Sequence, residues 1–262
     1  MKFVVIASGS KGNCTYYEHN GVSILIDAGI SFRQIQNRLL SKQIDVMTID
    51  HVFITHEHTD HVAGLDIFMK KTNATCHITT ETYDSLYFKV KDNVDQSRIR
   101  FITPFEEVDI SGFSVLPFSV SHDASDAVGY ILHFDQKRIV HATDIGYLPA
   151  KDFELLENAD GYVFESNYDV TLLFTSNRPF YLKQRIDSVK GHMSNTDSAY
   201  NMSKLVGNKT KKIVLIHPSR ECNTPKKALD TYIEVFNDYG LDINEYNVSV
   251  ATQDVPTDIF EL

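Results

Sequence analysis

The sequence predicts an α/β fold in which two β-sheets pack together and helices lie on the outside. Short β-branched or aromatic runs recur through both halves of the 262-residue chain, and helical segments lie between them and near the C-terminus. Several of these runs end on a side chain that can bind a metal ion. Because no long linker, low-complexity tract or repeat marks a boundary, we expect one domain spanning residues 1–262.

In the first half, predicted strands alternate with predicted helices. The strands are the apolar runs at 2–8, 14–19, 22–27 and 51–55. A helix is predicted over 31–42, since apolar side chains recur there at near-helical spacing after Ser31, a residue type that caps helices. The stretch 61–72 also has a helical pattern. The histidine-rich stretch before it therefore lies at a junction between a strand and a helix.

The second half repeats this organisation. Predicted strands lie at 113–122, 128–134, 138–144, 161–166 and 212–217. Predicted helices lie at 149–158, 195–206 and 224–239. Strand-rich halves with interspersed and terminal helices are typical of two packed sheets.

Composition restricts the class of protein. The net charge of −10 argues against a protein that coats nucleic acid or binds anionic membranes. It does not exclude a nuclease whose positive charge is confined to its active site. The three cysteines, Cys14, Cys76 and Cys222, are odd in number and widely spaced, which suits a reducing compartment; the roles of Cys14 and Cys222 are left open. No signal-peptide pattern and no run of about 18 apolar residues is present, so we expect a cytoplasmic protein that does not contact membranes.

Residues 52–65, "VFITHEHTDHVAGL", place four potential ligands at the end of an apolar strand: His56, His58, Asp60 and His61. Unpaired polar groups are costly in a core, so this is either a solvated histidine-rich loop or a metal site. Imidazole nitrogens with a carboxylate oxygen suit Zn²⁺, Mn²⁺ or Fe²⁺ better than Ca²⁺. Four groups so close in sequence do not easily surround one ion, but they can be shared between two adjacent ions.

Three later strands also end on potential ligands, namely His122, Asp144 and His217. Strand ends gather along one edge of a sheet, so groups far apart in sequence can converge there. The remaining histidines fit no such pattern, and we expect them to be surface or packing residues. They are His19, His51, His77, His133 and His141.

The stretch "HEHTDH" after "VFIT" resembles the H-x-H-x-D-H signature of the metallo-β-lactamase fold, and His122, Asp144 and His217 fall in the order of that superfamily's later motifs. The resemblance covers essentially the whole chain. It implies an αββα sandwich, with two mixed sheets face to face, helices outside and a two-metal site at one edge. Carried over by residue, one metal uses His56, His58 and His122, and the other uses Asp60, His61 and His217, with Asp144 bridging.

A narrower resemblance is to the bacterial YycJ/WalJ family. The stretches that carry it are "SGSKGNC" (8–14), "LIDAG" (25–29), "RIDSVKGHMSN" (185–195) and "HPSRECNTP" (217–225). It implies a 5′→3′ exonuclease that acts on double-stranded DNA with Mn²⁺ or a related ion. The element around residue 192 also resembles the H-x-S/T element of phosphodiesterases, which implies that His192 protonates the leaving group, with Ser194 and Asn195 near the phosphate and Glu165 paired with His192.

Further substrate contacts are expected from two segments. The turn containing Ser10 and Asn13 has several free N–H groups and can touch a phosphate, although such turns are also ordinary hairpin chemistry. The segment 178–190 has four cations, Arg185 among them, and the aromatic pair Phe180 and Tyr181. It offers phosphate contacts and a stacking surface, or else it is a solvated loop with both rings tucked into the fold.

The sequence therefore predicts a two-metal phosphodiesterase, in particular a DNA exonuclease, in which hydroxide from a metal-activated water attacks phosphorus and Asp60 shuttles a proton. Asp27 is expected to orient the ligand loop rather than to bind metal. The alternatives are a small-molecule cyclic phosphodiesterase of the PhnP type, a glyoxalase-like thioester hydrolase, and a non-catalytic metal-binding module. The sequence leaves open the physiological metal, the strand polarity beyond the resemblance, and the oligomeric state.

Overall fold

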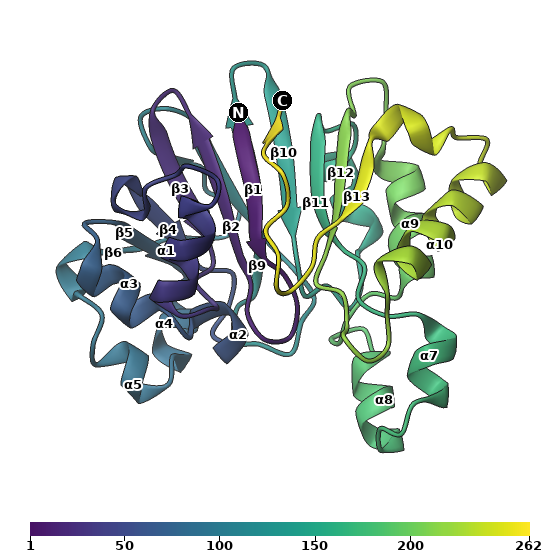
Figure 1. Ribbon diagram of the computed structural model, residues 1–262, viewed down its shortest axis with the longest axis horizontal. Helices are drawn as coiled ribbons and strands as arrows, with labels where there is room; N and C mark the ends of the chain where they lie inside the picture. Colours follow the sequence, from purple (N-terminus) through teal and green to yellow (C-terminus); the bar gives the residue numbers. More distant parts are fainter. The chain divides into compact units, whose positions relative to one another are not determined.

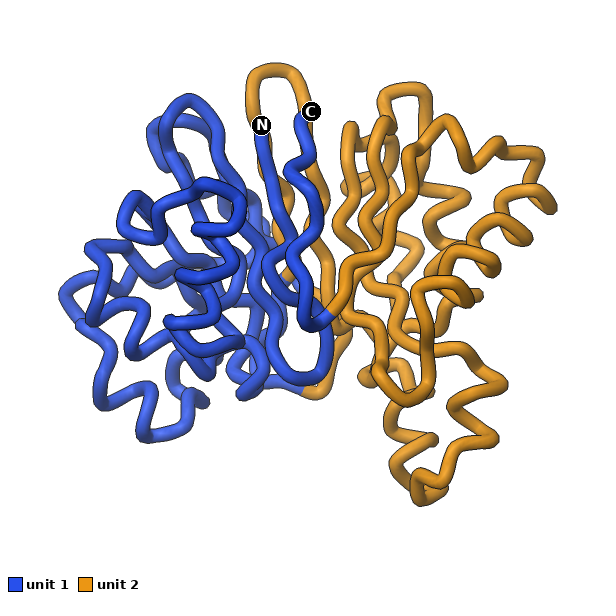
Figure 2. The backbone as a smooth tube through the Cα atoms, in the orientation of Figure 1, with its two compact units in different colours: residues 1–119, 124–128, 253–261 blue, residues 120–123, 129–252, 262 orange.

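The computed structural model describes residues 1–262, and the chain divides into two compact units (Figures 1 and 2). Unit 1 comprises residues 1–119, 124–128 and 253–261, and unit 2 comprises residues 120–123, 129–252 and 262. The single domain expected from the sequence stays a prediction. No helix combines the length and the apolar character that crossing a membrane requires.

Unit 1 contains a seven-stranded sheet with the order β14-β1-β2-β3-β4-β5-β6. Its strands are β1 (Lys2–Ala7), β2 (Cys14–His19), β3 (Val22–Ile26), β4 (His51–Phe53), β5 (Thr75–Ile78), β6 (Ile99–Phe101) and β14 (Phe260–Glu261). The pairs among β14, β1, β2 and β3 are antiparallel, whereas β3 to β6 run parallel. Because β3 and β4 run parallel, the segments after their last residues, Ile26 and Phe53, leave the sheet at the same edge.

Helices pack on this sheet through a buried apolar cluster that includes Leu25, Leu39, Val52 and Phe68 (Figure 1). They are α1 (Phe32–Leu40), α2 (Thr59–Val62), α3 (Leu65–Lys71), α4 (Thr80–Ser85) and α5 (Phe88–Lys91), with 3₁₀ turns η1 (Val46–Thr48) and η2 (Gln96–Arg98). Ser31 caps α1 as predicted, in a reciprocal capping box with Gln34.

The helix expected over 61–72 is interrupted, and that prediction was wrong in detail. The chain ends α2 at Val62 and starts α3 at Leu65. Gly64 lies between them, where its N–H donates to the Ala28 carbonyl (2.8 Å) and an added Cβ would lie 2.1 Å from the Ile30 carbonyl oxygen. This close approach of two backbones fixes the break and joins the helical segment to the loop after β3.

The second sheet also has seven strands. Its first two, β7 (Val108–Asp109) and β8 (Ser114–Ser119), belong to unit 1 and pair antiparallel. The other five are β9 (Val128–Phe134), β10 (Lys137–Ala142), β11 (Gly161–Glu165), β12 (Lys212–Ile216) and β13 (Val248–Val250). β9 and β10 pair antiparallel, whereas β10 to β13 run parallel, so the last residues of β10, β11 and β12 meet at one edge.

The helices of unit 2 are α6 (Phe153–Leu156), α7 (Val170–Thr175), α8 (Phe180–Ile186), α9 (Asn195–Leu205) and α10 (Pro225–Asp238), with turns η3 (Ala150–Asp152) and η4 (Ile243–Tyr246). The side chains of Ser194 and Thr224 cap α9 and α10. In Figure 1, α7 and α8 project from the end of the unit at the lower right. Two mixed sheets with helices confirm the predicted fold class.

Candidate metal centre and active site

The loop after β4 brings together the four potential ligands of unit 1. His56 and His61 are buried, while His58 and Asp60 are partly exposed. The ring centroid of His56 lies 4.0 Å from that of His61 and 4.6 Å from that of His58. The loop therefore forms a compact group of imidazole nitrogens with one carboxylate.

Asp27, directly after β3, holds this group in place. Its buried carboxylate accepts hydrogen bonds from the Thr55 N–H (2.9 Å), from Thr55 Oγ1 and from His61 Nδ1 (2.7 Å). Burial raises the pKa of Asp27, and the bonds from His61 and Thr55 oppose that shift. Since Nδ1–H of His61 donates to Asp27, Nε2 keeps the lone pair that a metal requires.

The turn between β1 and β2 packs against the same loop. The Asn13 N–H donates to the Asp60 carbonyl (2.7 Å), and Asn13 Nδ2 lies 3.1 Å from His61 Nε2. An added Cβ on Gly29 would lie 1.7 Å from the Asp60 carbonyl oxygen. Gln253, from the C-terminal segment, donates to the Gly12 carbonyl (2.8 Å) and fixes the turn.

Unit 2 gathers its candidate residues from the ends of parallel strands. One potential ligand atom from each of Asp144, Glu165, His192 and His217 lies within 4.8 Å of the others. His122 Nε2 lies 3.8 Å from Asp144 Oδ1. The sequence predicted that His122, Asp144 and His217 would converge at strand ends, and in this unit they lie close together.

Hydrogen bonds at Nδ1 orient the histidines of unit 2. Glu165 Oε1 lies 2.9 Å from Nδ1 of both His192 and His217, and the Gly191 carbonyl accepts from His122 Nδ1 (3.1 Å). Asn167 Nδ2 donates to the His217 carbonyl (2.8 Å). A proton on Nδ1 that points to these oxygens would leave Nε2 of His122 and His217 as the basic atom that can bind a metal, whereas protonated His192 would carry a proton on both nitrogens.

Backbone strain coincides with these positions. Asp27, Asp144 and His217 have φ values of 62°, 53° and 57°, in the left-handed region that side-chain-bearing residues rarely adopt. Such strain, of order 1 kcal/mol per residue, persists where the surroundings fix it, and it is concentrated at functional sites. At all three positions it turns the chain just after a strand ends.

The buried charges shift one another's pKa. Burial is the largest influence on the pKa of His192 and lowers it, but the charge and hydrogen bond of Glu165 and the charge of Asp144 outweigh burial and raise it overall. Burial raises the pKa of Glu165, yet the two imidazoles bring it below its usual value. Burial lowers the pKa of His122. A carboxylate paired with an imidazolium is the favoured state of Glu165 and His192.

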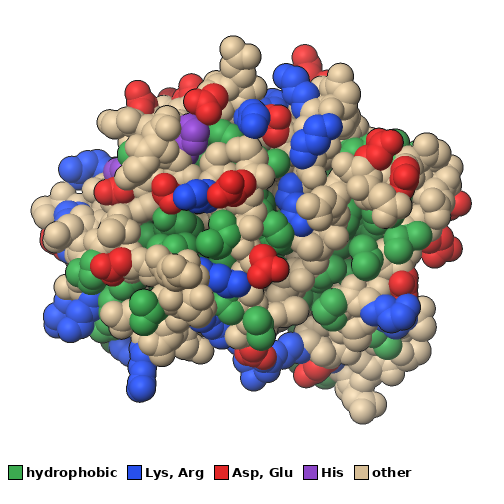
Figure 3. Space-filling view, turned by 45° about the horizontal axis from the view of Figure 1, so that its top comes forward, with side chains coloured by type: hydrophobic (Ala, Val, Ile, Leu, Met, Phe, Trp, Pro, Cys, Tyr) green, Lys and Arg blue, Asp and Glu red, His purple; other side chains and the backbone are tan.

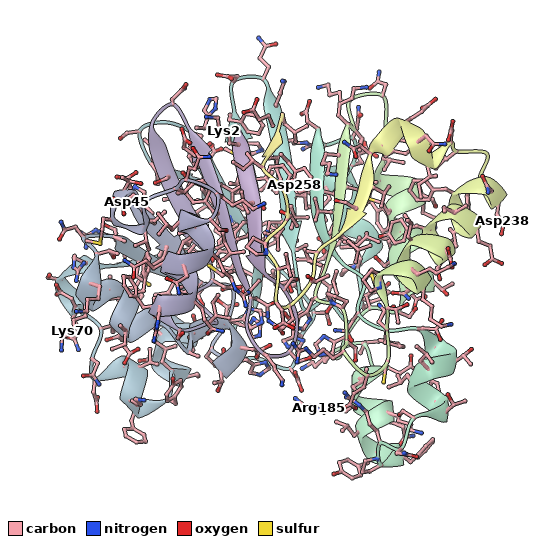
Figure 4. All side chains as sticks on the ribbon, in the orientation of Figure 1. Lys2, Asp45, Lys70, Arg185, Asp238 and Asp258 are labelled. Atoms are coloured by element: carbon pink, nitrogen blue, oxygen red, sulfur yellow. The ribbon has the colours of Figure 1, made fainter.

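The five predicted phosphate contacts have different surroundings. Ser10 is exposed. Asn13 is buried against Asp60, and Ser194 caps α9 by accepting from the Asp197 N–H (3.0 Å). Asn195 is buried, and its Oδ1 accepts from Ser166 Oγ (2.7 Å). Arg185, labelled in Figure 4, donates through Nε to Asp123 (2.7 Å).

Three groups that orient the histidines were not identified from the sequence: Thr55, the Gly191 carbonyl and Asn167. Thr55 directly precedes His56, the first candidate ligand, and Asn167 lies two positions after Glu165. This closeness in sequence was the one indication that both residues belong to the site. The role of the Gly191 carbonyl could not be predicted, because every residue has a backbone carbonyl. Each unit nevertheless presents nitrogen and oxygen donors of the kind that Zn²⁺, Mn²⁺ and Fe²⁺ bind, so the residues fit a metal centre.

Two mixed seven-stranded sheets, with histidine and aspartate side chains at the strand ends, define a metallo-β-lactamase-fold hydrolase. Residues 23–217 match the family model described as the beta-lactamase superfamily domain. The chain therefore belongs to the β-lactamase superfamily, and it is a metal-dependent hydrolase. The predicted resemblance to this fold is confirmed.

The chain is 34% identical to the exodeoxyribonuclease WalJ of Streptococcus pneumoniae over 99% of this chain and 98% of that protein. It is 29% identical to the exodeoxyribonuclease YycJ of Bacillus anthracis, again over 99% and 98%. A solved structure, the metallo-β-lactamase fold protein YhfI of Bacillus subtilis, has a TM-score of 0.71 at 16% identity and covers 99% of both chains. The whole-chain matches confirm the narrower resemblance to the YycJ/WalJ family.

Proposed function

We propose that this chain is a DNA exonuclease that hydrolyses phosphodiester bonds with two divalent metal ions. The observation that carries the proposal is His192, an accessible imidazole held at Nδ1 by the buried Glu165 and 3.3 Å from Asp144. This arrangement supports a role for His192 as a proton donor beside the candidate metal ligands. Full-length similarity to two proteins named exodeoxyribonucleases supports the nuclease class. In more detail, we propose that the substrate is duplex DNA and that it is degraded in the 5′→3′ direction.

The ligand assignment implied by the family is part of the proposal. In that assignment His56, His58 and His122 would hold one ion, Asp60, His61 and His217 would hold the other, and Asp144 would be a ligand shared by both. The donor set suits Mn²⁺ or Zn²⁺, with Fe²⁺ also compatible. When bound, two such ions lower the pKa of a water molecule and offset negative charge at phosphorus.

The protein's own groups supply proton transfer. Asp60 accepts a proton from the attacking water, and His192 donates one from Nε2 to the departing oxygen. Glu165 keeps His192 protonated and directs its Nε2 away from the carboxylate. Of the predicted phosphate contacts, the exposed Ser10 and Arg185 reach substrate, whereas the buried Asn13, Ser194 and Asn195 hold the site's loops.

A substrate panel tests the proposal. Protein reconstituted with Mn²⁺ or Zn²⁺ is given 5′-phosphorylated duplex DNA, single-stranded DNA, RNA, a cyclic phosphodiester and a thioester. We expect duplex DNA to be degraded from its 5′ end, and Asp60→Ala to abolish the reaction. Hydrolysis confined to the cyclic phosphodiester would favour the PhnP-type alternative, and hydrolysis of the thioester alone would favour the glyoxalase-like one.

A leaving-group comparison tests the role of His192. Replacement of a general acid lowers kcat by about 10²–10⁴-fold when the leaving oxygen needs a proton. His192→Ala should therefore lower DNA hydrolysis by such a factor, and should affect bis(p-nitrophenyl) phosphate far less, because p-nitrophenolate leaves without a proton. Equal losses on both substrates would show that His192 does not protonate the leaving group.

A further inference from the structure

The two helices α7 and α8 form a hairpin whose base is firmly packed in unit 2. Tyr168, Leu173 and Cys222 form a buried cluster there, with Leu172 and Ile186 packed against it. Lys183 is buried, and its Nζ donates to the carbonyls of Phe174 (2.8 Å) and Ser176 (2.7 Å) at the end of α7. The hairpin thus has a fixed shape.

On this rigid support, two aromatic rings of α8 face solvent. Phe180 is 65% exposed and Tyr181 is 73% exposed. The sequence left two alternatives for these rings, and the structure excludes the one in which they are tucked into the fold. Since Lys183 and the cluster at the base already hold the hairpin, neither ring is needed for its packing.

The face of α8 that carries Tyr181 leads directly to the candidate active site of unit 2. Arg185 follows Tyr181 by four positions and so lies on the same helix face, about 6 Å further along the axis. Its guanidinium bonds Asp123 through Nη2 (2.5 Å), and Asp123 Oδ1 lies 3.4 Å from His122 Nε2. The His192 N–H donates to the carbonyl of Ile186, the last residue of α8 (2.9 Å).

Charge near the hairpin is largely offset. Residues 178–190 contain four cations against one acid, Asp187, but Lys183 is buried against backbone carbonyls, Arg178 pairs with Glu221 and Arg185 pairs with Asp123. The face drawn in Figure 3 shows acidic and basic side chains interspersed, with no extended basic patch. Because three of the four hairpin cations are already engaged and the net charge of the chain is −10, contacts that do not depend on charge are needed in addition to hold a polyanion.

We propose that α8 is a base-stacking platform: Tyr181, with Phe180 beside it, stacks on an unpaired nucleobase of the strand whose phosphodiester bond is cleaved. Nucleobases stack on exposed aromatic rings irrespective of sequence. This inference rests on the proposed nuclease function and adds to it the element that holds the DNA end.

The test compares Tyr181→Ala, Tyr181→Phe and Tyr239→Ala in the metal-reconstituted full chain. Tyr239 is an exposed aromatic (51%) after α10, and Figure 4 shows its neighbour Asp238 far from Arg185. We expect Tyr181→Ala to lower kcat/KM on DNA about 10-fold and to leave bis(p-nitrophenyl) phosphate hydrolysis unchanged. Tyr181→Phe keeps a stacking ring and should retain activity on DNA, as should Tyr239→Ala.

A binding measurement gives a readout that does not depend on cleavage. In an Asp60→Ala background, a duplex with 2-aminopurine at its 5′ end should lose fluorescence on binding, and Tyr181→Ala should prevent that loss. Normal quenching and DNA cleavage in Tyr181→Ala would overturn the platform, as would equal losses on DNA and on the small diester. If the unsubstituted protein cleaves only the small diester, the nuclease proposal itself fails, and this outcome is distinct from the others.

Discussion

The two groups of candidate ligands are oriented by the same device, a buried carboxylate just at a strand end, but they use it differently. In unit 1, Asp27 accepts from one imidazole, the fully buried His61. In unit 2, Glu165 accepts from two, His217 and the partly exposed His192. The comparison predicts different roles for the two carboxylates. Asp27 would only hold a candidate ligand, whereas Glu165 would hold a candidate ligand and also favour the protonated form of His192.

The largest expected effect follows from that double role. Glu165→Gln keeps the size of the side chain but removes the charge that favours protonated His192, so kcat on duplex DNA should fall by about 10²–10⁴-fold. Because proton delivery is lost, saturating Mn²⁺ should not restore the rate. Full recovery with added metal would show that Glu165 only orients a ligand, as Asp27 does.

The corresponding change in unit 1 should be milder and reversible. Asp27→Asn weakens the acceptor for His61 and Thr55, and loss of such an orienting partner lowers metal affinity by about 10–100-fold. A metal titration should therefore show lowered activity that recovers at high metal concentration. Asp258→Asn, at an exposed side chain of the same unit, is the control and should titrate like the unsubstituted protein. Failure to recover at any concentration would give Asp27 a role in catalysis itself.

The same contrast explains how much of the site could be predicted from sequence. The candidate ligands of unit 1 lie within one loop, so their spacing alone is enough to predict them. His122, Asp144 and His217 could be predicted only because each follows a recognisable apolar strand. The orienting carbonyl of Gly191 could not, because it depends on the close approach of two segments and any residue supplies a carbonyl.

The fold was predictable to a similar extent. The long apolar strands are all present, whereas β5, β6, β13 and β14 have only two to four residues and were not predicted. Polar residues such as His77 in β5 and Arg100 in β6 hide the alternation of apolar and polar side chains in strands this short. The α7–α8 hairpin depends on Lys183 bonding two carbonyls of the preceding segment, which is a tertiary contact that local pattern does not contain.

Two glycines allow a smaller effect to be compared between the units. An added Cβ would lie 1.7 Å from the Asp60 carbonyl oxygen at Gly29, and 2.2 Å from the Arg185 carbonyl oxygen at Gly191. We expect each alanine variant to lose about 1–3 kcal/mol of unfolding free energy in urea titrations. Gly29→Ala should also displace the ligand loop of unit 1 and reduce bound metal.

Gly21→Ala separates this steric effect from backbone strain. Gly21 has φ +80° but nothing within 4 Å of an added Cβ, so its variant should lose stability and keep its metal. Equal metal content in all three variants would show that the backbone around Asp60 accommodates the extra methyl group.

The smallest effect at neutral pH concerns a histidine pair that has no orienting carboxylate. His77 Nε2 lies 3.1 Å from His51 Nδ1, and the His77 ring stacks on Phe53 with centroids 4.2 Å apart. Burial, followed by the neighbouring His51 and Arg100, lowers the pKa of His77 to about 3. This is the reverse of His192, whose carboxylate partner raises its pKa.

Because the pKa of His77 is lower in the folded chain, the unfolded chain takes up a proton below about pH 6.5 that the folded chain does not, and stability falls as the pH decreases toward 3. Between pH 7.5 and 5 this contributes a loss of about 2 kcal/mol. His77→Phe retains a ring on Phe53 and should remove that part of the pH dependence in urea titrations. If the free energy of unfolding depended on pH identically in the two proteins, burial would not lower the pKa of His77, and the contrast with His192 would fail.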